Sequence, residues 1–108
     1  MADPTAFDSI LAELQAKHPD AEVEPLNYSN GRMIVRTPDE GSYARFITDS
    51  GDATKRAQAA KALARRCILW PSLDEVDVLF TRKPGLVARI VDKLLDKAGA
   101  GDEITLGK

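Results

Sequence analysis

The sequence is poor in the residues that most often carry chemistry. Its 108 residues include one cysteine and one histidine, so neither an internal disulfide nor a His and Cys metal site is predicted. Arg65 and Arg66 would lower the pKa of the Cys67 thiol, but His18, the sole imidazole, lies at a distant helix end. We therefore interpret Cys67 as a buried structural thiol, and we expect neither an enzyme nor a cofactor.

Aromatic residues, net charge and long apolar runs are also scarce. Aromatic side chains make up 6% of the chain, so its core depends on Leu, Ile, Val and Ala, as is typical of helical domains. The formal net charge is -2 and both signs are mixed, which gives nucleic acid binding no overall support. No apolar run approaches the roughly 20 residues of a membrane span, so we expect no membrane association.

The remaining composition predicts one domain in a reducing compartment. A chain of this length forms a single modest core, which we assign to residues 1–100, with a flexible tail at 101–108. The single thiol favours a reducing compartment, and the first residues lack the pattern of a secretory signal. We therefore expect the protein in the cytoplasm.

The N-terminal third is predicted to form a helix and a β-hairpin. The helix covers residues 3–17, beginning with an aspartate cap and a proline. Strands at 22–28 and 32–36 flank Asn30-Gly31, a pair that supplies the backbone angles of a tight hairpin turn. Pro25 has no amide hydrogen, so we expect the first strand at an edge. The sequence thus predicts an α+β fold that is mostly α, with about five helices and one hairpin.

Four more helices are predicted from cap and stop signals. Ser72 and Glu75 form a capping box, and alanines give the third helix strong helix propensity and room for close packing. The last helix is the most amphipathic, and we assign its apolar face to the core. The alternative is that this face meets a partner helix, and part of it could also serve self-association. The predicted spans are Thr37 to Gly51, Asp52 to about Cys67, Ser72 to about Arg82, and Pro84 to Gly99.

Two segments resemble the tail assembly chaperones of siphophage-like phages and prophages. Arg36 to Phe46 is similar to that family's strand ending in arginine, proline cap and helix bearing Tyr and Phe. From Cys67 to Leu86, four features follow the family's order: the cysteine, the Trp70-Pro71-Ser72 corner, the Phe near a helix end and the Pro-Gly turn. With the hairpin and the last helix, the likeness extends over residues 10–99.

The resemblance implies a non-enzymatic protein that binds the long tape-measure protein and helps recruit tail-tube subunits during tail morphogenesis. It also implies that the protein acts in the bacterial cytoplasm and is absent from the finished virion. A long helical chain exposes apolar stripes before the tube closes around it, and covering them prevents aggregation. The candidate partner-binding residues are Tyr43, Arg45, Lys61, Arg65, Arg66 and Trp70.

The alternative is a small regulatory or nucleic-acid-associated module that acts through the basic third helix. That helix is basic through Lys55, Arg56, Lys61, Arg65 and Arg66, which could follow phosphates or bind an acidic protein. Nearby acids offset this charge, and the following helix is acidic, which argues against docking like a helix-turn-helix. Trp70 has two interpretations as well: an aromatic anchor for a partner, or a ring that fills the corner between the third and fourth helices.

Overall fold

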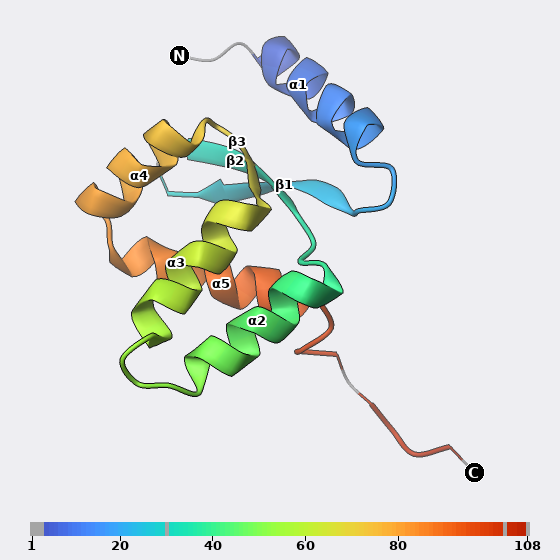
Figure 1. Ribbon diagram of the computed structural model, residues 1–108. Coiled ribbons are helices and arrows are strands. Elements are labelled where there is room, and N and C mark those ends of the chain that lie inside the picture. Colours follow the sequence, from blue (N-terminus) through green and yellow to red (C-terminus); the bar gives the residue numbers. More distant parts are fainter. Residues whose placement is uncertain (1–3, 30, 103, 108) are drawn as a thin grey trace.

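A computed structural model describes residues 4–29, 31–102 and 104–107 of the chain, and within them it confirms the α+β, mostly α, fold. The predicted cap Asp3 and the turn residue Asn30 lie outside the described residues. The hairpin and its edge strand are confirmed, because the antiparallel sheet has the order β1-β2-β3. The elements are α1 (Pro4–Lys17), β1 (Val23–Tyr28), β2 (Gly31–Arg36), α2 (Glu40–Ser50), α3 (Arg56–Cys67), β3 (Ile68–Trp70), α4 (Leu73–Arg82) and α5 (Gly85–Lys97) (Figure 1).

The central strand β2 separates two apolar layers. Its residues Met33, Ile34 and Val35 are each 0% exposed, and successive side chains of a strand point to opposite faces. Met33 and Val35 join the larger cluster, formed with α3, α4 and α5, whereas Ile34 joins a smaller cluster under α1. α1 accordingly lies across the sheet from α3 and α5 (Figure 1).

The strand β3 was missed by the sequence analysis, which predicted only a corner between two helices. Ile68 pairs with Val35 and Trp70 pairs with Ile34, so Leu69 is an extra residue and the register shifts there. Ile68 faces the larger cluster, while Leu69 and Trp70 face α1. Three residues between two helices are too few for the alternation that identifies a strand.

The start of α2 corrects one predicted cap. We expected Thr37 to cap this helix, with Pro38 at its first position. Instead Asp39 is the cap, because its carboxylate accepts a hydrogen bond from the backbone amide of Ser42 at 2.7 Å. The proline therefore precedes the helix and is buried.

The start of α3 was also predicted wrongly. The helix begins at Arg56 and not at Asp52. The Asp52 carboxylate accepts hydrogen bonds from the amide and the hydroxyl of Thr54, at 2.9 and 2.7 Å, and so closes a turn of its own. An aspartate that bonds locally in this way favours a turn over a helix.

Other helix ends agree with the sequence analysis. The α4 capping box is confirmed, since Ser72 Oγ accepts from the Glu75 amide and Glu75 accepts from the Ser72 amide, both at 3.3 Å. Gly99, which follows α5, has the positive φ of 96° that glycine adopts readily. Beyond Asp102, the described residues form no helix or strand, and the flexible tail stays a prediction.

The larger cluster forms the core of the domain. On α5, Ile90, Val91 and Leu94 are buried, which confirms that this apolar face belongs to the core. On α4, Val76 and Phe80 are buried, whereas Leu73 is 43% exposed. Within the described chain, no helix combines the length and apolarity needed to cross a bilayer.

Shortening Leu94 to alanine tests this core. Leu94 is 0% exposed, so Leu94→Ala removes buried contacts and leaves a cavity, at a cost of about 2–5 kcal/mol in the free energy of unfolding. The matched control is Val78→Ala on α4, where the side chain is 52% exposed and the change should stay within about 0.5 kcal/mol. Urea unfolding of both variants gives the comparison, and equal losses would contradict the assignment of Leu94 to the core.

Candidate functional site

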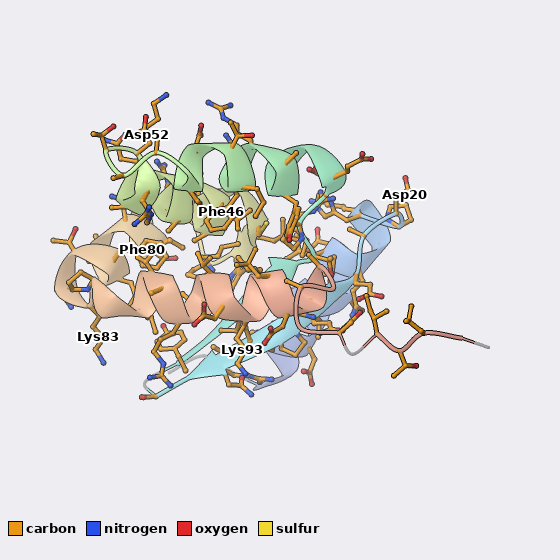
Figure 2. All side chains as sticks on the ribbon, turned by 90° about the horizontal axis from the view of Figure 1, so that it is seen from below. Asp20, Phe46, Asp52, Phe80, Lys83 and Lys93 are labelled. Atoms are coloured by element: carbon orange, nitrogen blue, oxygen red, sulfur yellow. The ribbon has the colours of Figure 1, made fainter. Side chains whose placement is uncertain are left out.

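An open groove of about 380 Å³ lies where α3, α4 and α5 meet. Small side chains form much of its wall, and Phe80, which is labelled in Figure 2, also lines the groove although its side chain is only 4% exposed. The Thr81 hydroxyl donates to the Asp77 carbonyl at 2.9 Å, so its hydrogen is used within α4. The lining residues are Ala57, Ala60, Lys61, Phe80, Thr81, Pro84, Val87 and Ala88.

Lys61 is the candidate residue that the structure places in this groove. Its side chain is exposed on α3, and the ion pairs found among the described residues do not include it. The groove thus combines an apolar wall with an ammonium group that is open to solvent. That combination suits an apolar helical segment that carries an acidic residue beside its apolar stripe.

Two of the candidate arginines are engaged within the domain. Arg65 Nε on α3 lies 3.3 Å from Asp77 Oδ1 on α4, an ion pair that links these helices. Arg45 Nε lies 3.7 Å from Asp49 Oδ2, one turn further along α2. Both arginines are partly exposed, so these pairs contribute little to stability, yet they reduce the free positive charge.

The remaining helical candidates lie around the start of α2. Tyr43 is half-buried on α2, and Arg66 is exposed on α3. The pKa of the Asp39 carboxyl is lowered, first by its hydrogen bonds from the Ser42 backbone and side chain, and further by the charges of Arg36 and Arg66. Arg66 therefore acts on the cap of α2, away from the groove residues.

Trp70 lies on the other side of the sheet from the groove. Its ring meets the Phe7 ring edge to face, with centroids 5.5 Å apart and planes at 78°. The indole therefore belongs to the layer under α1 and does not fill the corner between α3 and α4. The structure thus separates Trp70 from the other five candidates.

The thiol of Cys67 is buried, as predicted. Burial raises its pKa to about 11, and the opposing charges of Arg36 and Arg66 do not offset this effect. A thiol with such a pKa is protonated at neutral pH and is a poor nucleophile. Among the described residues, no three His, Cys, Asp or Glu side chains are grouped so as to hold a metal ion.

A second hollow, of about 240 Å³, lies beside the start of α2 and carries charges of both signs. Lys97, which lies in its wall, is ion-paired with Glu24 on β1. The mixture does not favour a ligand of either charge. The residues around this hollow are Asp20, Ala21, Glu22, Arg36, Thr37, Pro38, Asp39 and Lys97.

Residues 13–107 match a family profile described as Domain of unknown function (DUF6848). The chain belongs to this family. No curated protein matches the sequence. The fold is similar to the solved structure of the uncharacterised protein rbstp2171 from Bacillus stearothermophilus, with a TM-score of 0.70 and 20% sequence identity. That likeness covers 89% of this chain and 98% of the other, and at this identity it shows the fold alone.

Sequence reasoning found little of the groove in this DUF6848 chain. Lys61 was a candidate, whereas Ala57 and Ala60 were read only as small residues that let helices approach closely. A signal was present, because Ala57, Ala60 and Ala88 are small side chains on two helices that cross. Whether such residues close a contact or leave a hollow depends on the crossing geometry, which sequence periodicity does not give.

The state of Cys67 can be tested by chemical labelling. Because the thiol is buried and its pKa is raised to about 11, a thiol-specific reagent at neutral pH should modify native protein about a hundredfold more slowly than urea-unfolded protein. Absorbance of the released chromophore follows the reaction. Comparable rates in the two states would contradict a buried, protonated thiol.

The cap of α2 should make stability depend on pH. The pKa of Asp39 is lowered in the folded state, so its carboxylate stabilises the fold above its ordinary pKa, and this contribution is lost as pH falls toward the folded pKa. Asp39→Ala removes the cap and should cost about 1 kcal/mol near neutral pH.

Asp39→Asn is the matched control, because asparagine also caps helices but does not titrate in this range. Urea unfolding at about pH 7 and about pH 3 should show the wild-type protein losing stability relative to this variant on acidification. An unchanged difference between the two proteins would rule out the titration of Asp39 as the cause.

Proposed function

We propose that this DUF6848 protein is a non-enzymatic phage tail assembly chaperone, which binds helical segments of a tape-measure protein before the tail tube closes around them. The observation that carries the proposal is the open apolar groove between α3, α4 and α5, with Lys61 in its wall. A groove of this kind takes the apolar side chains of a partner helix.

The groove coincides with part of the resemblance to tail assembly chaperones. Phe80, Thr81 and Pro84 line it, and all three belong to the Cys67 to Leu86 segment that follows the chaperone family's order. The features that suggested the family and the surface that could bind a partner therefore lie in one stretch of chain.

Stoichiometric coverage is the proposed mechanism. A long tape-measure helix exposes apolar stripes, and many copies of a small domain can cover them and keep the chain from aggregating. We further propose that the protein helps recruit tail-tube subunits, that it acts in the bacterial cytoplasm and that it is absent from the finished virion. It requires no chemistry, in keeping with the raised pKa of the single thiol.

Observations on α3 do not favour the nucleic-acid alternative. Arg65 is ion-paired with Asp77, and Arg56 Nε donates to the Ser50 carbonyl at 3.0 Å. Binding to a polyanion relies on several free cationic side chains that displace counterions together. Since these two arginines are already engaged, we do not extend the proposal to nucleic acid.

Co-expression with the tape-measure protein of the same genome tests the proposal. We expect one soluble complex with several copies of this chain per tape measure, measured by size-exclusion chromatography with light scattering. Ala57→Trp places a large ring in the groove and should lower the amount of complex about tenfold, as expected for a change at the centre of an interface.

Ala44→Trp is the matched control, because Ala44 is also a helical, exposed alanine but lies on α2 outside the groove. This variant should form the complex as the wild-type protein does. A tape measure that aggregates while this chain elutes alone would refute the chaperone function, and equal effects of the two variants would refute the groove as its site.

A further inference from the structure

The segment that follows α5 exposes two large apolar side chains. Ile104 is 87% exposed and Leu106 is 99% exposed, more than any other exposed large apolar residue of the described chain. Residues 104–107 extend away from the helices and the sheet in both views of the molecule (Figure 1, Figure 2). We call residues 102–107 the tail segment, and the family match includes it. Its two apolar side chains gain free energy when a second surface covers them.

The order of residues in the tail segment groups one charge with both apolar side chains. Successive side chains of an extended chain point to opposite sides, so Asp102, Ile104 and Leu106 would share one side. Asp102 is exposed, and it precedes the first apolar residue by two positions. An extended tail segment therefore presents a carboxylate at one end of a short apolar stripe.

The groove between α3, α4 and α5 offers the complementary surface. Its wall is largely apolar, and Lys61 adds an exposed ammonium group that no ion pair found among the described residues includes. Its volume of about 380 Å³ lies in the range of pockets that hold small ligands. A carboxylate beside an apolar stripe matches an ammonium group beside an apolar wall in both charge and apolar character.

The tail segment cannot present this whole stripe to the groove of its own chain. The groove lies near the start of α5, at Ala88, whereas the tail follows the other end of that helix. The Asp102 amide donates to the Gly99 carbonyl at 3.1 Å, which holds Asp102 at that end. The helix rises about 14 Å between Ala88 and its last residue, so the Asp102 carboxylate is out of reach of Lys61 in the same chain. The tail segment of a second copy is free of this restraint.

We propose that the tail segment of one copy docks in the groove of a second copy, with Asp102 beside Lys61 and with Ile104 and Leu106 against the apolar wall. The contact is small, so the association is weak and reversible. The docked tail covers the groove until a tape-measure helix displaces it. This displacement rests on the proposed function, whereas the contact between copies does not.

Sedimentation velocity of the full-length protein over a range of concentrations tests the contact. We expect the average mass of wild-type protein to rise with concentration. Leu106→Asp removes an apolar group from the contact and should weaken the association about tenfold. Because Leu106 is 99% exposed, this change leaves the fold intact. Thr105→Asp is the matched control, since it adds the same charge on the opposite side of an extended tail and should associate as wild type does.

Exchange of two charges tests the position of the tail in the groove. Lys61→Asp alone should weaken self-association, because it would place two carboxylates side by side. Combining it with Asp102→Lys should restore the association, since the pair is then re-formed with reversed signs. Circular dichroism of each variant checks that the domain is folded. A double variant that associates no better than Lys61→Asp would refute the pairing of Asp102 with Lys61.

Two further outcomes would overturn the proposal. Wild-type protein that stays monomeric at every concentration would exclude a contact between copies. Equal association of the Leu106→Asp and Thr105→Asp variants would exclude the apolar stripe as its cause.

Failure of this proposal and failure of the chaperone proposal are distinguishable. Leu106→Asp leaves the groove unchanged, so this variant should still form the complex with the tape-measure protein. Ala57→Trp fills the groove and should weaken both contacts. A tape-measure protein that aggregates alone, while wild-type copies of this chain associate with one another, would refute the chaperone function and leave the contact between copies standing.

Discussion

Burial of the strand β2 on both faces is the constraint on which the rest of the structure depends. Met33, Ile34 and Val35 alternate between the faces, and none of them is exposed. A hairpin with one solvated face could not hold this sequence, since at least one of these side chains would then meet water. The fold therefore needs a cover on each side, and it uses the larger helical layer on one and α1 on the other.

The extra residue Leu69 ties these two layers together. α3 runs directly into β3, so the residues after Cys67 must pass from the larger core to the edge of the sheet. Without the shift in register, Ile68 and Trp70 would point to the same face, because side chains alternate along a strand. With it, Ile68 stays with the larger core while Trp70 joins Ile34 under α1. The bulge thus places Trp70 beside Leu69 on the α1 side of the sheet.

Sequence reasoning located the features that local chemistry determines. The α4 capping box, the edge strand with Pro25 and the amphipathic α5 follow from bonds or periodicities within a few residues, and the structure confirms them. It failed where several local options compete. Thr37 and Asp39 are both good caps, and only the path of the chain decides between them. The groove and β3 depend on how distant segments meet, and no spacing within one segment encodes that arrangement.

The unequal attachment of the two layers bears on what each surface can do. The groove is formed by helices that also build the larger core, and Phe80 belongs to both, so the groove is presented by the part of the fold expected to open last. α1 rests on a smaller cluster with few polar contacts, and such elements open locally at lower free energy than the whole domain. A rigid groove suits repeated binding of similar segments along a tape-measure chain.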